Sequence, residues 1–111
     1  MPHSVKRGDL KTLRWNLARD LTGVSEARVL IRAPGAGSPV ISRLADLDAP
    51  ATAGIVSLAL GSTDWEPGKL AVTDPDGPIP HYLVEIRTLP GPLTHPEDGY
   101  ELLYVTQDLG P

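Results

Sequence analysis

The sequence contains no cysteine and no phenylalanine among its 111 residues, and aromatic residues make up only 5% of it. The lack of cysteine excludes disulfides, thiolate catalysis and zinc–thiolate sites. A small domain without disulfides or zinc–thiolate sites must gain its stability from an apolar core or from assembly with other chains. Because phenylalanine is absent, the volume of that core has to come from Leu, Val, Ile and the few Trp and Tyr residues.

Long apolar runs are missing as well. No run approaches the ~20 residues that a membrane-spanning helix needs, and the N-terminal segment has no apolar stretch typical of a signal peptide. The net charge is −4, from 14 acidic and 10 basic residues. Nucleic-acid-binding proteins usually show a basic excess or stripe. We therefore expect neither a membrane nor a nucleic acid as the partner.

Alternation of apolar and polar residues is the main structural signal. The chain has 11 glycines and 12 prolines, and these fall between the apolar runs as turns. Regular alternation predicts strands over 11–17, 26–32, 55–60, 81–88 and 99–106. Shorter runs predict strands over 40–44 and 69–72. Segment 46–53 reads as a turn or a single helical turn, and 89–98 reads as a Pro/Gly connector.

This pattern predicts an all-β fold, a single immunoglobulin-like antiparallel β-sandwich of about six to eight strands. A small barrel is the alternative. The length fits one domain with one core. We expect that domain to span 1–111, with its core over about 10–107 and extended arms at 1–9 and 108–111.

Motifs that would carry catalysis or a cofactor are not found in the sequence. No serine lies in a Gly-x-Ser-x-Gly elbow, and the carboxylates form no evident acid/base pair. The Gly35-Ala36-Gly37 segment lacks the third glycine of a dinucleotide loop. We therefore expect a protein that is not an enzyme, with no catalytic residue and no cofactor.

A metal site is not expected either. Asp74, Asp76 and Gly77 resemble the opening of a calcium loop, but Pro78 follows and Glu85 falls inside a predicted strand, so the loop is incomplete. The histidines lie on three separate segments without ligand spacing. They are His3, His81 and His95.

The two tryptophans have different expected roles. Trp15 is in register with Leu13 and Leu17, so we expect it in the core. Trp65 precedes a Pro-Gly turn, where its ring either covers the end of the sandwich or inserts into a neighbouring protein, as tryptophan often does at interfaces.

Several short segments occur in an order that matches a known family. The order resembles the immunoglobulin-like domain at the N-terminus of the baseplate upper protein of tailed bacteriophages, which small stand-alone phage virion proteins also carry. The resemblance spans about residues 5 to 107. The segments are Lys6-Arg7-Gly8-Asp9, Asp20-Leu21-Thr22-Gly23, Ala27-Arg28-Val29, Ala51-Thr52-Ala53-Gly54-Ile55-Val56, Pro67-Gly68, Tyr82-Leu83-Val84-Glu85-Ile86 and Glu97-Asp98-Gly99-Tyr100.

Two departures from the family shape the expectation. Residues 70–80 intervene between the Pro-Gly turn and the Tyr82 strand, which we interpret as an added contact loop. The sequence also stops shortly after the domain, without the family's receptor-binding or oligomerising extension. The second departure removes the linking role of the upper baseplate protein and favours a bare docking or covering module.

The resemblance implies a structural protein of a tailed phage or phage-like particle, located in the tail, baseplate or neck. A capsid decoration (cement) protein is one alternative. A carbohydrate-binding module is another, which would need two or three aromatic rings aligned on one exposed face, whereas Trp15 and Tyr82 are expected to point inward. The implied location is the virion, after synthesis in the bacterial cytoplasm.

The implied partners are other virion proteins, namely tail, baseplate or connector proteins or the major capsid protein, with several copies in a symmetric assembly. Contacts are expected through edge strands, the termini and residues 61–80. The candidate partner-contact residues are Val5, Lys6, Arg7, Trp65, Asp74, Asp76 and Leu109.

Overall fold

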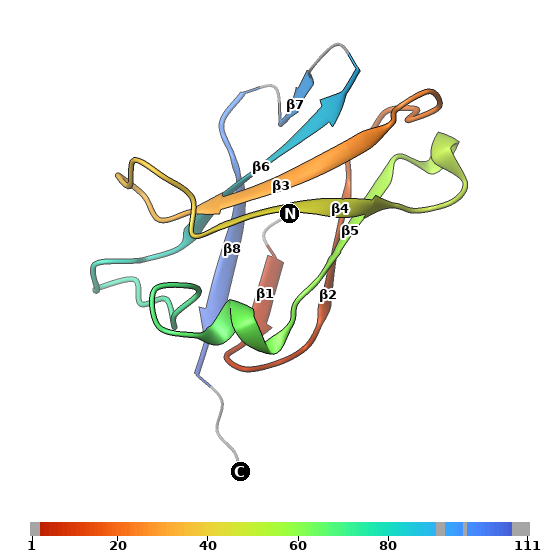
Figure 1. The fold of residues 1–111 in the computed structure, drawn as a ribbon. Coiled ribbons are helices and arrows are strands. Elements are labelled where there is room, and N and C mark those ends of the chain that lie inside the picture. The colour runs from red at the N-terminus through yellow and green to blue at the C-terminus, as the bar shows by residue number, and fades with distance from the viewer. Residues whose placement is uncertain (1–2, 91–92, 97, 108–111) are drawn as a thin grey trace.

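The chain is built from strands and the turns between them (Figure 1). The computed structural model describes residues 3–90, 93–96 and 98–107. The strands are β1 (His3–Lys6), β2 (Thr12–Asn16), β3 (Glu26–Arg32), β4 (Ile41–Leu47), β5 (Ile55–Ala59), β6 (Tyr82–Leu89), β7 (Leu93–His95) and β8 (Glu101–Thr106). Two short 3-10 helices are η1 (Ala51–Ala53) and η2 (Ser62–Trp65). The expected all-β class is confirmed.

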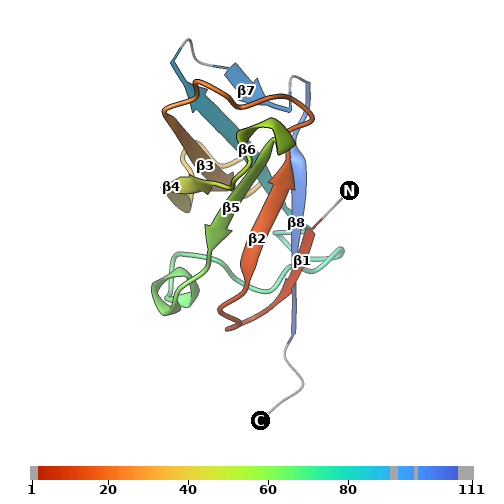
Figure 2. The ribbon, with the colours of Figure 1, turned by 90° about the vertical axis from the view of Figure 1, so that its right-hand side faces the viewer.

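The strands form one hydrogen-bonded path in the order β1–β8–β6–β3–β4–β5–β2, with β7 added beside β6. Strand β4 joins two layers, because it pairs with β3 up to Ala45 and with β5 at Asp46 and Leu47. The path thereby folds back on itself and brings β1 near β2 (Figure 2). The result is a sandwich that is nearly closed like a barrel. One ladder departs from the antiparallel expectation, since β1 runs parallel to β8.

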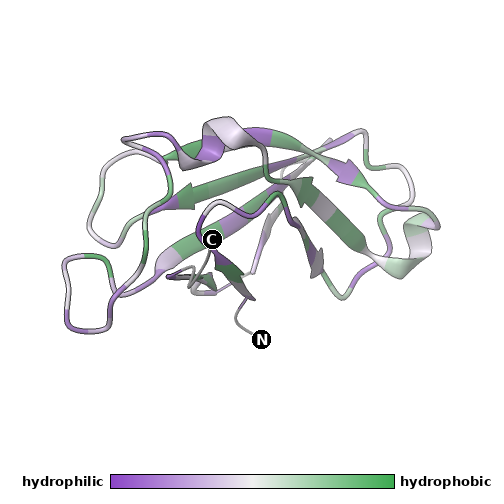
Figure 3. Cartoon of the chain, turned by 90° about the horizontal axis from the view of Figure 1, so that it is seen from below, coloured by the Kyte–Doolittle hydropathy of each residue, from purple (hydrophilic) through white to green (hydrophobic). Residues whose placement is uncertain are grey.

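The core lies between the two layers and is filled by alternate residues of the strands. Colour alternates between apolar and polar along several strands in Figure 3. Trp15 of β2 and Tyr82 of β6 are each only 1% exposed, so both point inward as expected. They supply the bulk that phenylalanine would otherwise provide. The smaller core residues include Ala27, Val29, Ile31, Val56, Leu58, Val84, Ile86, Leu103 and Val105.

Four sequence-based assignments differ from the structure. Strand β4 runs to Leu47, past the predicted end at 44, because its last residues switch partner to β5. Segment 69–72 forms no strand, since Leu70 packs into the core from an irregular loop. The connector over 89–98 contains β7, a three-residue strand too short to show alternation. The expected N-terminal arm over 1–9 contains β1, whose ladder to β8 extends the sheet.

The long segment between β5 and β6 is fixed to the sandwich by hydrogen bonds. The Ala71 amide donates to the Tyr82 hydroxyl at 2.9 Å. Thr73 exchanges backbone and hydroxyl hydrogen bonds with Val105 at 2.8–3.1 Å. The β6–β8 ladder reaches only as far as Leu103 of β8. Beyond it, on the same edge of β8, Thr73 is hydrogen-bonded to Val105 in place of a β6 residue. The segment 61–80 therefore closes one end of the fold.

Candidate docking surface

One surface combines exposed leucines with exposed charges: the solvent side of the sheet formed by β4, β3, β6 and β8, which we call the outer face. Strand residues alternate between the two sides of a sheet. Since Val29, Ile86 and Leu103 are buried, their neighbours along each strand point outward. The outer face comprises Glu26, Arg28, Leu30, Arg32, Ser42, Leu44, Leu83, Glu85, Arg87, Leu89, Leu102 and Tyr104.

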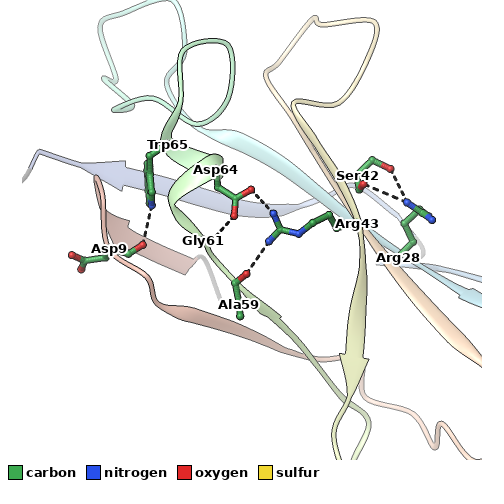
Figure 4. A network of polar contacts seen from close by, with 8 residues as sticks. All are labelled: Asp9, Arg28, Ser42, Arg43, Ala59, Gly61, Asp64 and Trp65. Atoms are coloured by element: carbon green, nitrogen blue, oxygen red, sulfur yellow. Dashed lines mark hydrogen bonds and ion pairs between the residues drawn. The ribbon is translucent and has the colours of Figure 1, made fainter.

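Two like charges face each other at the centre of the outer face. Arg28 of β3 is opposite Arg87 of β6 in the ladder, and both side chains are exposed. Arg28 donates to the carbonyl and hydroxyl oxygens of Ser42, each at a long 3.3 Å (Figure 4). Within the described residues the Arg87 side chain has no hydrogen bond or ion pair. Like charges directly opposite each other destabilise a sheet, so an acidic group bound here would relieve a local cost.

A hollow of about 250 Å³ lies at this arginine pair and is lined by Glu26, Arg28, Arg87 and Leu89. Leu89 is 38% exposed, and Leu44, which is opposite Arg28 on β4, is 54% exposed. The hollow therefore offers two guanidinium groups, one carboxylate and aliphatic surface. Such a combination fits another protein surface that presents an acidic side chain next to apolar groups.

The arginine pair was missed by the sequence-based list of contact residues. Alternation over 26–32 and 81–88 already predicted that Arg28 and Arg87 lie on polar strand faces. It could not predict that these two strands are neighbours, or that their register places the two arginines opposite each other. Which residues are opposite each other is known only once the pairing of strands distant in sequence, here β3 and β6, is known.

Four of the predicted contact residues gather at one end of the fold. Val5 lies in β1 and is only 4% exposed, so its side chain belongs to the core. Lys6 and Arg7 follow it and are exposed. The indole N–H of Trp65 donates to the Asp9 carbonyl at 2.9 Å, so the loop after β1 packs against η2 (Figure 4). Trp65 is half-buried and covers the end of the core, one of its two expected roles.

The other predicted contact residues lie elsewhere. Asp74 and Asp76 are exposed in a tight turn, where the Asp74 carboxylate accepts the Asp76 amide at 3.0 Å. This turn follows Thr73, which borders β8 on the side away from β1. Leu109 lies outside the described residues.

A polar network fills the gap where β4 separates from β5 (Figure 4). The Arg43 guanidinium of β4 binds the Asp64 carboxylate of η2 and donates to the Ala59 carbonyl at 2.8 Å. The second Asp64 oxygen accepts the Gly61 amide at 2.8 Å, and Asp64 is only 4% exposed. Each polar atom of this buried carboxylate thus has a partner, which makes the network a structural brace between the two layers.

In the part of the chain that the structure describes, Tyr100 is the one exposed aromatic residue, whereas carbohydrate binding would need two or three exposed rings on one face. Of the five, Trp15 and Tyr82 are buried and Trp65 is half-buried. Tyr100 is 40% exposed, and its ring lies 5.2 Å from the Arg32 guanidinium, which also donates to the Tyr100 hydroxyl at 2.7 Å. Tyr104 stacks edge-on against His81.

One histidine has an altered proton affinity. Burial lowers the pKa of His95 below its usual value, an effect that the Glu101 carboxylate at 3.7 Å partly offsets and that the Arg19 charge reinforces. This pair joins the end of β7 to the start of β8, and His95 is the register partner of Ile86, the residue next to Arg87. Across residues 3–90, 93–96 and 98–107, no three His, Asp or Glu side chains lie close enough to hold a metal ion.

The same ranges contain no helix that is long and apolar enough to cross a membrane. We compared the chain with protein-family models, with curated proteins and with solved structures, and none of them matches it.

Proposed function

We propose that the chain is a structural protein of a tailed bacteriophage or phage-like particle, an immunoglobulin-like module of the tail, baseplate or neck that works by protein–protein docking. The docking part of this proposal rests on the outer face, where the opposed Arg28 and Arg87 lie beside the exposed Leu44 and Leu89. Arginine is enriched in protein interfaces, and its planar guanidinium binds a carboxylate with two parallel hydrogen bonds.

The strand order supports the immunoglobulin-like part of this proposal. Constant-type immunoglobulin domains pair strands B, E and D in one sheet and strands C, F and G in the other. If β2 is taken as strand B and β8 as strand G, the ladders β2–β5–β4 and β3–β6–β8 follow these two orders. Strand β7 is an addition, and β1 joins the edge of β8.

The segments that resemble the phage domain occupy structurally demanding places, which supports a fold shared with that domain. Gly23 turns the chain between β2 and β3 with φ +86°. Tyr82 begins β6 and fixes the loop at Ala71 through its hydroxyl. Gly99 leads into β8 with φ +74°. Residues with such roles are expected to recur in proteins of one fold.

The test uses the particle encoded by the same genome. Its tails and its capsids are purified separately, and the tagged protein is titrated onto each. We expect saturable binding to the tail fraction. Arg87→Glu should weaken this binding at least tenfold, or about 1.4 kcal/mol. The matched control, Arg14→Glu, makes the same substitution on an exposed residue of β2, outside both the outer face and residues 61–80, and should bind like the parent.

Each other outcome has a defined meaning. Binding to preformed capsids alone would make the protein a capsid decoration protein. Binding to neither fraction, together with its absence from purified particles by mass spectrometry, would overturn the proposed structural role. Equal weakening by both variants would show only a general charge effect and would overturn the outer face as the docking surface.

A further inference from the structure

Strands β1 and β2 are consecutive and yet share no ladder. Five residues, 7–11, connect them, and the ladder orders make them run in opposite directions. Strands joined by so short a loop usually pair with each other as a hairpin. Here β1 pairs with β8 and β2 pairs with β5 (Figure 2).

The seam between β1 and β2 is bridged by side chains. Nε2 of His3 lies 2.5 Å from the Arg14 carbonyl, so it donates there, and the Lys11 ammonium donates to the Ser4 carbonyl at 3.0 Å. The His3 and Trp15 rings meet at 5.1 Å. Two buried nitrogens at this contact, His3 Nδ1 and Trp15 Nε1, have no hydrogen-bond partner within the described residues. Unpaired buried polar atoms make the closed seam less stable.

Strand β1 is therefore weakly bound to the rest of its own chain. Val5 is its one buried residue. A hollow of about 300 Å³ flanks it, lined by Ser4, Val5, Lys6, Asp9, Lys11 and Thr106. Segments with few buried apolar contacts open locally at low free-energy cost. Opening of β1 would leave the backbone groups of β8 from Leu103 to Thr106 unpaired on that side, ready for another parallel strand.

We propose that β1 is exchanged between two copies of this chain, so that each copy places its β1 on the β8 strand of the other. Exchange keeps every β1–β8 hydrogen bond and the His3 contacts of the seam, so the two forms differ in the hinge over 7–11, whose extension also separates Asp9 from Trp65. Leu10 is 67% exposed in this hinge. In the exchanged dimer the two hinges extend side by side, and the two Leu10 side chains gain a contact that the single chain lacks.

This inference concerns pairing between identical copies and goes beyond docking onto a different virion protein. Its test involves no particle, so it and the proposed function can fail separately. Since the chain has no cysteine, single cysteines report the pairing directly. Lys6 and Thr106 are register partners in the β1–β8 ladder, and both are exposed.

The experiment mixes the single variants Lys6→Cys and Thr106→Cys at high concentration and then oxidises them. One variant carries a mass tag so that heterodimers and homodimers separate on a non-reducing gel. We expect an excess of covalent heterodimers, because exchange brings the two sulfurs together. The matched control mixes Lys69→Cys with Thr106→Cys, in which the first cysteine lies outside β1. Light scattering on the parent protein should show a species of twice 11.8 kDa that increases with concentration. Leu10→Ser should reduce it.

A parent protein that stays monomeric at every concentration, with no more heterodimer than in the control mixture, would overturn the exchange. A dimer that forms without the Lys6–Thr106 cross-link would also overturn it, because that dimer must associate through another surface. Circular dichroism of each variant verifies that the sandwich is still folded.

Discussion

Asp64 of η2 binds Arg43 of β4 across the gap where β4 leaves β5, and this contact joins the two layers of the sandwich. The Asp64 carboxylate is buried, whereas the Arg43 side chain is 37% exposed. The two partners are thus affected unequally when the pair is broken, since only the carboxylate lacks access to water.

Removal of the carboxylate should destabilise the fold. Asp64→Ala deprives the Gly61 amide and the Arg43 guanidinium of their shared acceptor, and we expect the free energy of unfolding to fall by about 2 kcal/mol. Urea denaturation measures this change. Arg14→Gln is the control, because Arg14 pairs with Asp48 at 3.6 Å while 62% exposed. That variant should change stability by less than about 1 kcal/mol, and an equal loss in both variants would contradict the bracing role of Asp64.

Neutralisation of Arg87 should not destabilise the fold, in contrast to removal of the Asp64 carboxylate. Arg87→Gln removes the like charge opposite Arg28, so we expect the free energy of unfolding to stay constant or rise by up to about 0.5 kcal/mol. Glu26 and Glu85 are on the same face, each two positions along its strand from Arg28 and Arg87 respectively. Their negative charges already offset part of the repulsion between the arginines, so the gain in stability is small. Lys69→Gln is the control for loss of one positive charge. A clear loss of stability in Arg87→Gln would show that the arginine stabilises the free protein, and would weaken the case that it serves a partner.

The sequence predicted the strands that alternate over many residues and missed features that depend on strand partners. The predicted segment 26–32 coincides with β3, and the inward positions of Trp15 and Tyr82 are confirmed. Strand β7 escaped prediction because three residues between prolines show no period. The Arg28–Arg87 opposition could not be predicted, because register between β3 and β6 is set by tertiary packing.

The stability of the protein should depend on pH through His95. Burial lowers the pKa of His95 in the folded protein, so the unfolded chain accepts the proton first as the pH falls below the usual value of 6.5. The free energy of unfolding should therefore decrease from that value down to the pKa of the folded state, and then level off with respect to this group. His95→Gln should remove this contribution to the slope when unfolding is measured at a series of pH values.

The pKa of His95 should also respond to its neighbour. Glu101→Gln removes the carboxylate that raises this pKa, so we expect a further decrease in an NMR titration of the imidazole protons. Glu66→Gln, at the end of η2, removes a distant carboxylate and should leave the titration unchanged. An increase of the His95 pKa in Glu101→Gln would contradict the assigned contact.

Two glycines with similar backbone angles should differ sharply in their tolerance of a side chain. Gly23 has φ +86° and Gly54 has φ +74°, so alanine is strained at both. A Cβ at Gly23 would meet no atom within 4 Å, whereas a Cβ at Gly54 would lie 2.4 Å from the Arg19 carbonyl oxygen. Backbone strain alone costs about 1–2 kcal/mol, which is the loss of unfolding free energy that we expect for Gly23→Ala.

Gly54→Ala should cost at least about 2 kcal/mol more than Gly23→Ala, because the contact is with backbone and cannot be relieved by a side-chain rotation. Hydrogen bonds hold Gly54 in place, since its carbonyl accepts the Leu17 amide at 2.8 Å and its own amide donates to Ala51 at 3.2 Å. Urea denaturation of the two variants side by side measures the difference. Equal losses would mean that the loop after Leu17 shifts freely away from β5, and that η1 does not fix the approach of these two segments.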